Sequence, residues 1–171
     1  MTEISKKLIG FEVCLKELTN NIINKNLSNS LIFYGNQGIG KSTFSYKLIN
    51  TVFSSLNENS DLTNQENLIY NNSHPNLIVI HKELSEKKDV SRNFIIIEQI
   101  RKLESYIYQS SFNNMPKFII IDSADDLNIN SANAILKILE EPKENTYFIL
   151  ISHQLSKLLP TITSRCIKFR F

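Results

Sequence analysis

One short stretch, Leu31–Thr43 (LIFYGNQGIGKST), restricts what this chain can fold into more than any other part of it. It combines an apolar segment, a glycine-rich turn and the start of a helix-periodic pattern. The turn fits the sequence G-x-x-x-x-G-K-[S/T] from Gly35 to Ser42. A strand before such a turn and a helix after it are the context in which the pattern marks a phosphate-binding loop. The sequence therefore predicts such a loop, the alternative being a glycine turn with a solvated lysine.

The residue types in the loop suit phosphate binding. Glycine reaches positive φ at little cost, so successive backbone N–H groups can converge on one anion, and the following helix adds the positive end of its dipole. Lys41 is expected to reach the β- and γ-phosphates, and the Ser42 hydroxyl to ligate Mg²⁺. We expect ATP and Mg²⁺, because no guanine-reading N-K-x-D segment follows the loop. The nucleotide-binding residues predicted here are Gly35, Asn36, Gln37, Gly38, Ile39, Gly40, Lys41, Ser42 and Thr43.

Composition excludes several other classes of protein. The 171 residues, 42% hydrophobic and 21% charged, suit one globular domain spanning residues 1–171. A net charge of +2 is too small to indicate nucleic-acid binding on its own. Cys14 and Cys166 lie far apart without metal-ligand spacing, which predicts no zinc site and a reducing compartment. No apolar run approaches the roughly 20 residues of a membrane span, so we predict a cytoplasmic protein with no membrane partner.

Strand-like and helix-like segments alternate along the chain. Helices are predicted at 6–26, after the glycine loop, at 96–110 and at 132–140, and strands at 31–34, 77–80, 117–121, 147–151 and 166–169. Asn130 or Ser131 is expected to cap the helix at 132–140. The polar segment 54–75 is predicted to be a surface excursion with one helical turn, and 81–93 a charged loop. This alternation predicts a three-layer α/β fold with a parallel sheet, whose ligands bind at the carboxyl ends of the strands.

A second motif, FIIID, ends the predicted strand 117–121 at Asp122. A carboxylate at this place can hold Mg²⁺ together with Ser42, which gives Asp122 a nucleotide-side and metal-side role. ATPases of this class usually follow the aspartate with a glutamate that polarises the attacking water, whereas this chain has Ser123. Asp125 and Asp126 are displaced by two or three residues. Since a positioned base supplies about 10²- to 10⁴-fold in rate, we expect nucleotide binding to be retained and hydrolysis to be lost.

Three further segments carry a resemblance to a known family. They are residues 121–128 (IDSADDLN), 131–142 (SANAILKILEEP) and 159–166 (LPTITSRC). In this order after the glycine loop, they resemble the delta-prime family of bacterial DNA polymerase III clamp-loader subunits. The likeness runs from about residue 9 to residue 169. It implies the AAA+ type of P-loop NTPase, as a core without the lid and collar domains of that family.

The resemblance also implies roles for single residues. Arg165 matches an arginine that clamp loaders offer to ATP on the neighbouring subunit, so it is expected to act in trans as an arginine finger, the alternative being a rim arginine in a surface salt bridge. Ser152 or His153 matches a polar sensor residue, and the sequence does not choose between them. Lys137 matches a basic residue that can touch the DNA backbone, the alternative being a solvated helix lysine.

Three departures from the family qualify these expectations. Many relatives carry a four-cysteine zinc module where this chain has the cysteine-free segment 54–75, so no zinc is predicted. Some delta-prime subunits have a degraded glycine loop, whereas this loop is intact. Relatives also continue into a helical lid and a collar. A chain ending at Phe171 lacks both, and we expect weak ATP binding and poor self-assembly.

The leading interpretation is a delta-prime-type clamp-loader subunit with little or no ATP turnover of its own. Its implied partners are the tau/gamma and delta subunits, the sliding clamp and, through the assembly, primer-template DNA. One alternative is a tau/gamma-like motor that hydrolyses ATP itself, against which Ser123 argues. Another is a scaffold that does not bind nucleotide, against which Lys41 and Ser42 argue.

Overall fold

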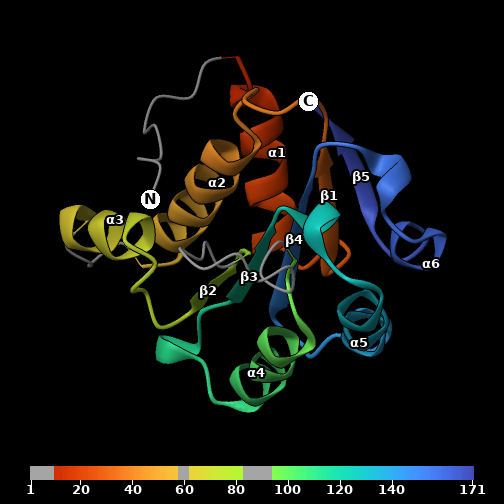
Figure 1. The fold of residues 1–171 in the computed structure, drawn as a ribbon. Helices are drawn as coiled ribbons and strands as arrows, with labels where there is room; N and C mark the ends of the chain where they lie inside the picture. The colour runs from red at the N-terminus through yellow and green to blue at the C-terminus, as the bar shows by residue number, and fades with distance from the viewer. Residues whose placement is uncertain (1–9, 58–61, 83–93) are drawn as a thin grey trace.

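A single parallel sheet with the strand order β2-β3-β4-β1-β5 divides the molecule into layers (Figure 1). The computed structural model describes residues 10–57, 62–82 and 94–171, and the loop expected at 81–93 therefore lies largely outside the described residues. The strands are β1 (Ser30–Tyr34), β2 (Leu77–Ile80), β3 (Lys117–Asp122), β4 (Thr146–Ser152) and β5 (Ile167–Arg170). The α-helices are α1 (Glu12–Ile23), α2 (Lys41–Leu56), α3 (Leu62–Tyr70), α4 (Ile97–Tyr108), α5 (Ile129–Glu140) and α6 (Pro160–Thr163). Short 3-10 turns are η2 (Phe112–Asn114), η3 (Ala124–Asp126) and η4 (Leu155–Lys157).

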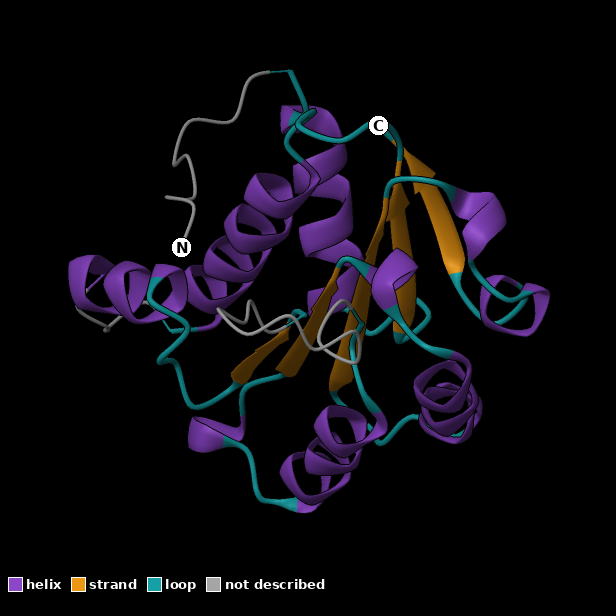
Figure 2. Ribbon diagram, viewed as in Figure 1, coloured by secondary structure: helices purple, strands orange, loops and turns teal. Residues whose placement is uncertain are grey.

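Helices cover both faces of the sheet, as the secondary-structure colouring of Figure 2 makes plain. Alternate residues of one strand enter two separate cores. In β1, Leu31 and Phe33 pack with α1, α2 and α3, while Ile32 packs with α4, α5 and α6. This two-sided burial explains why β1 to β4 are continuously apolar, whereas β5 at the edge of the sheet alternates apolar and basic residues. The predicted three-layer α/β fold with a parallel sheet is confirmed.

The helix after β3 begins earlier than the sequence suggested. The prediction placed its start at Ala132 with a cap at Asn130 or Ser131, and this was wrong. The cap is Asn128, whose Oδ1 accepts hydrogen bonds from the Ser131 backbone N–H at 2.8 Å and from the Ser131 hydroxyl at 2.9 Å. Ser131 also donates to the carbonyl of Ile95 at 2.7 Å, so a side chain expected to cap the helix lies buried within its first turn.

Segment 54–75 contains more structure than the predicted surface excursion with one helical turn. Helix α2 continues to Leu56, and α3 then forms a full helix. Ile69 of α3 is fully buried, and Tyr70 stacks on Tyr46 with ring centroids 5.7 Å apart. Together with hydrogen bonds from Gln65 to Asn50 and Ser54 of α2, these contacts anchor α3 against α2. None of the helices in the described ranges is long and apolar enough to cross a membrane.

Buried polar side chains fasten the amino edge of the sheet. The Lys117 ammonium group donates to the carbonyls of Tyr106 at 2.6 Å and Gln109 at 2.5 Å, at the end of α4. A cation at a helix C-terminus satisfies carbonyls that lack partners within the helix. Asn76 exchanges two hydrogen bonds with the backbone of Phe112, at 2.9 and 2.8 Å. These contacts tie α4 and η2 to the start of β2 and β3.

His74 should make folding stability depend on pH. Its side chain is only 7% exposed, stacks on Phe53 at 4.4 Å, and accepts the Asn76 backbone N–H on Nδ1 at 3.1 Å. Burial lowers the pKa of His74 below its usual 6.5. The unfolded chain then binds the proton more readily, so this contribution to stability is complete above pH 6.5 and declines as the pH falls below it. One additional proton gives a slope of at most about 1.4 kcal/mol per pH unit.

Urea unfolding at pH 7.5, 6.5 and 5.5 would measure this slope. His74→Gln should flatten it in that window, whereas the matched change at exposed His81, His81→Gln, should leave it unchanged. An equal slope in wild type and His74→Gln would contradict the assignment.

Candidate functional site

The glycine loop after β1 adopts the conformation that its composition predicts. Gly38 and Gly40 have φ values of 83° and 94°, in the left-handed region that favours glycine. Gly40 is the N-cap of α2, so the loop leads directly into the helix N-terminus. Gly35 also has a positive φ, 146°, and has a second reason to be glycine. A Cβ at this position would lie 2.6 Å from the backbone oxygen of Phe171, which follows the adjacent β5.

Lys41 closes the loop from within. It is 3% exposed, and its Nζ donates to the carbonyls of Gly35 at 2.8 Å and Asn36 at 2.7 Å. Burial lowers the pKa of Lys41, and the carboxylates of Asp122 and Asp125 act in the opposite direction. An ammonium group held among backbone carbonyls and desolvated in this way is poised to exchange these acceptors for phosphate oxygens, which carry more negative charge.

Ser42 and Asp122 meet at the start of α2. The Ser42 hydroxyl donates to Oδ2 of Asp122 at 2.5 Å, although the two residues are 80 positions apart in the sequence. Serine and carboxylate oxygens are hard ligands of the kind that Mg²⁺ prefers, and Mg²⁺ is usually held by one or two protein oxygens plus phosphates and water. The residues present therefore fit a nucleotide-bound Mg²⁺ here. Elsewhere in the described ranges, no group of three or more His, Cys, Asp or Glu side chains could hold a metal ion.

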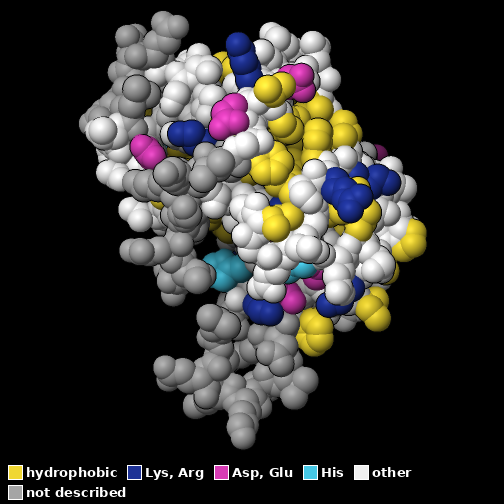
Figure 3. Space-filling model, turned by 90° about the horizontal axis from the view of Figure 1, so that it is seen from above, with side chains coloured by type: hydrophobic (Ala, Val, Ile, Leu, Met, Phe, Trp, Pro, Cys, Tyr) yellow, Lys and Arg dark blue, Asp and Glu magenta, His cyan; other side chains and the backbone are white. Residues whose placement is uncertain are grey.

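A wide cavity of about 1540 Å³ opens over the carboxyl edge of the sheet. Eight of the ten residues predicted to bind nucleotide line it: Asn36, Gln37, Gly38, Gly40, Lys41, Ser42, Thr43 and Asp122. The remaining two predicted residues, Gly35 and Ile39, do not line the cavity. A Cβ on Gly35 would also come within 2.8 Å of Ile39, whose side chain is partly exposed. From above, Figure 3 shows histidine, acidic and basic side chains close together beside an apolar area.

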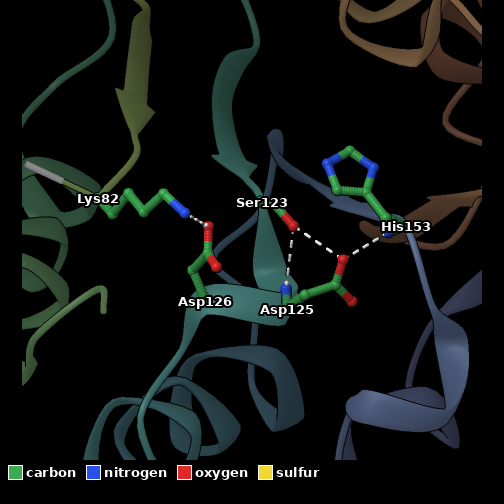
Figure 4. A network of polar contacts seen from close by, with 5 residues as sticks. All are labelled: Lys82, Ser123, Asp125, Asp126 and His153. Carbon is green, nitrogen blue, oxygen red and sulfur yellow. Dashed lines mark hydrogen bonds and ion pairs between the residues drawn. The ribbon is translucent and has the colours of Figure 1, made fainter. Parts of the chain in front are cut away.

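Asp125, which follows the replaced glutamate position, is fully engaged by its own chain (Figure 4). Its carboxylate accepts hydrogen bonds from the Ser123 hydroxyl at 2.9 Å, the Ser152 hydroxyl at 2.8 Å and the His153 backbone N–H at 2.5 Å. Asp126 instead forms an ion pair with Lys82 at 3.2 Å. From the sequence, Asp125 was expected to be displaced from the catalytic position. In the structure, its hydrogen bonds connect the end of β3 with the end of β4.

The two candidates for the sensor residue have different surroundings. Ser152 is fully buried and its hydroxyl is used by Asp125. His153 lines the cavity, and in Figure 4 its ring points away from Asp125. Of the two, His153 is the one whose side chain lies at the cavity wall.

Arg165 and the glycine loop lie at opposite edges of the sheet. Arg165 precedes the amino end of β5, which runs parallel to β1 with Ile167 beside Leu31. By this register Arg165 is level with Asn29, whereas the glycine loop begins at Gly35, after the carboxyl end of β1. Six residues at roughly 3.3 Å each separate the two levels by about 20 Å. Arg165 does not line the cavity, and it pairs with Glu140 of α5 and donates to the carbonyl of Thr161 at 2.8 Å. Lys137 is exposed on α5.

Sequence analysis missed the side of the cavity formed by α2 and the turn that follows α3. Tyr46 and Asn72 line it, and the Tyr46 hydroxyl donates to Oδ1 of Asn72 at 2.7 Å. Burial raises the pKa of Tyr46 to about 12, so the phenol stays protonated as a donor. One weak signal in the sequence could have indicated this part of the cavity, namely an aromatic residue five positions after Lys41. Cys166 is buried, and burial raises the pKa of its thiol to about 11.

Known proteins resemble this chain over most of its length. The family described as "DNA polymerase III, delta subunit" matches residues 11–171. DNA polymerase III subunit delta' of Pseudomonas aeruginosa is 41% identical over 96 residues, 56% of this chain and 27% of the relative. The Bacillus subtilis delta' subunit is 32% identical over 155 residues, 89% of this chain and 44% of the relative. The chain thus spans less than half the length of both relatives.

Solved structures share the fold. A DNA polymerase III gamma subunit-related protein from Thermotoga maritima superposes with a TM-score of 0.68 at 22% identity, covering 92% of this chain and 45% of that one. At this identity the likeness shows the fold, which is the AAA+ type of P-loop core. The chain therefore belongs to the DNA polymerase III delta subunit family, as a clamp-loader-type domain of the delta-prime kind.

Proposed function

We propose that this chain serves a DNA polymerase III clamp loader as a delta-prime-type subunit that holds ATP·Mg²⁺ without turning it over and offers Arg165 to a neighbouring subunit's nucleotide. The observation that carries the proposal is the position of Arg165 at the edge of the sheet opposite the glycine loop. An arginine side chain cannot span about 20 Å, so its own nucleotide is out of reach and a neighbour's is the target. The tau/gamma and delta subunits, the sliding clamp and primer-template DNA are the proposed partners.

Nucleotide binding is supported by the loop itself. The backbone N–H groups of the loop and of the start of α2 would surround the phosphates, and Lys41 would exchange the carbonyls of Gly35 and Asn36 for phosphate oxygens. Ser42 and Asp122 would hold Mg²⁺, which neutralises charge on the phosphates when it is bound. Exposed Lys137 is proposed to touch a DNA phosphate through the assembly.

Poor hydrolysis is supported by the partners of Asp125. A general base must be within hydrogen-bond reach of the attacking water and free to take its proton. Ser123 stands where ATPases of this class carry glutamate, and its hydroxyl is hydrogen-bonded to Asp125. The Asp125 carboxylate in turn accepts from Ser152 and His153. Asp125 is therefore a tether between strands rather than a base, and turnover should be slower by about 10²- to 10⁴-fold than with a positioned base.

Titration of fluorescent ATP with Mg²⁺ onto the purified chain, with phosphate release recorded in the same sample, tests this proposal. We expect saturable binding with turnover near background. Asp126→Asn serves as a matched control for Asp125→Asn, since both carboxylates belong to η3 and only Asp125 faces β4. Neither variant should change turnover. Robust ATP turnover that Asp125→Asn abolishes would instead support a tau/gamma-like motor subunit, the alternative with which the intact glycine loop is also compatible.

A further inference from the structure

We propose that Glu140 restrains Arg165 within its own chain, so that the guanidinium reaches a neighbour's nucleotide only when phosphate oxygens replace the Glu140 carboxylate. This inference rests on the proposed function, because it concerns when the arginine finger is available. Glu140 is the last residue of α5, and one of its carboxylate oxygens pairs with Nη2 of Arg165. The other terminal nitrogen, Nη1, donates to the carbonyl of Thr161 at 2.8 Å. Both terminal nitrogens thus already have an acceptor in the chain.

The position of this ion pair at the end of α5 favours an Arg165 side chain that stays paired with Glu140. The C-terminus of a helix carries partial negative charge, so an acidic side chain at the last position of α5 is unfavourable unless a cation lies beside it. Arg165 places a cation directly on this carboxylate, in addition to Lys137 in the last turn of α5. Among the described residues, its acceptors are Glu140 and the Thr161 carbonyl. The neighbouring Glu141 has the same charge and is also exposed, but does not pair with Arg165 in this structure.

The restraint is weak enough to be exchanged. The side chains of Arg165 and Glu140 are 33% and 47% exposed, and ion pairs at such positions are screened by water and salt. A polyphosphate offers several charged oxygens in place of one carboxylate, and guanidinium binds such oxygens with two parallel hydrogen bonds. A neighbouring subunit that brings a bound triphosphate to this edge would therefore displace Glu140. Without that triphosphate the arginine stays on its own chain.

The test is to titrate wild type and Glu140→Gln into a motor-subunit partner that has a working ATP site, and to record ATP hydrolysis. Removing the competing charge should lower the concentration of chain giving half-maximal stimulation by about twofold to fivefold, the range for an exposed ion pair. The maximal rate should not change. The difference should shrink in 1 M salt, where charges are screened within about 3 Å. Glu141→Gln is the matched control and should behave as wild type.

Further measurements separate the possible failures. Arg165→Ala that stimulates the partner like wild type would overturn the proposed function. If Arg165→Ala is inactive while Glu140→Gln equals wild type or stimulates less, the restraint alone is wrong. Combining Glu140→Gln with Arg165→Ala should give the Arg165→Ala result, because Glu140 acts through that arginine. On the isolated chain, NMR relaxation of the Arg165 side-chain Nε should show greater motion in Glu140→Gln, and unchanged motion would also overturn the restraint.

Discussion

Replacement of Lys41 by alanine is expected to weaken ATP binding at least about 100-fold. Hydrogen bonds to charged groups contribute roughly 1.5–3 kcal/mol each, and a lysine that reaches the β- and γ-phosphates makes at least two of them. About 1.4 kcal/mol corresponds to a tenfold change in affinity, so the loss should span two or more orders of magnitude. The ammonium group is already within the loop, bonded to Gly35 and Asn36, so little rearrangement precedes its contact with phosphate.

Fluorescence titration with an ATP analogue and Mg²⁺ measures this effect. Lys47→Ala is the matched control, because Lys47 lies on the same helix but does not line the cavity. Lys41→Met retains most of the aliphatic stem and should lose affinity in the same way, which separates loss of charge from loss of packing. Thermal melts of all three variants show whether they are folded. Affinity in Lys41→Ala equal to that of wild type would mean that nucleotide binds elsewhere.

The parts of the fold that the sequence predicted well are those determined locally. The strands β1 to β4 are runs of apolar residues bounded by polar ones, whereas β5 alternates apolar and basic residues. All five predicted strands match observed strands within one residue at either end. The glycine loop is likewise local, because the positive φ values at Gly38 and Gly40 are required by the backbone turn itself. The aspartate at the end of β3 was placed correctly, since carboxyl ends of parallel strands share one edge of the sheet.

The role of Asp125 could not be predicted because it depends on strand order. Its partner Ser152 is 27 residues away, and the two meet only because β4 lies next to β3, with Asp122 beside Ile151. A hydrophobic pattern fixes which segments are strands but not which strands are neighbours. The same limit applies to Arg165, whose distance from the glycine loop follows from the parallel pairing of β5 with β1.

Errors at helix boundaries have a different origin. Asn128, Asn130 and Ser131 are all good capping residues, and composition cannot rank them. Ser131 is not the N-cap, because its hydroxyl makes a buried hydrogen bond to the carbonyl of Ile95, which belongs to a distant segment of the chain. The polar segment before β2 concealed α3 for a similar reason. Its helix is held by Ile69 and by the Tyr70 ring on Tyr46, contacts that exist only once α2 is in place.

Replacement of Arg165 by alanine is expected to reduce ATP hydrolysis at the neighbouring subunit's site by about 10³-fold or more, the range of known arginine fingers. The guanidinium stays charged at all accessible pH values and can bridge the oxygens of a transferring phosphoryl group. At its own edge of the sheet, Arg165 has only the weak restraints of Glu140 and the Thr161 carbonyl, so the substitution should cost the fold little. The effect on catalysis should therefore far exceed the effect on stability.

The measurement requires a complex in which only the site facing this chain is active, because other sites would mask the loss. Phosphate release in single turnover then reports that site alone. Arg170→Ala is the matched control, since Arg170 is an exposed arginine at the opposite end of β5, beside Tyr34. Size-exclusion chromatography establishes that each variant assembles. If the Arg165→Ala complex assembles and hydrolyses ATP at the wild-type rate, Arg165 is not the arginine finger. If that complex fails to assemble, Arg165→Lys takes its place, because lysine keeps the charge but not the planar fork of the guanidinium. The Arg165→Lys complex should assemble and still hydrolyse ATP slowly.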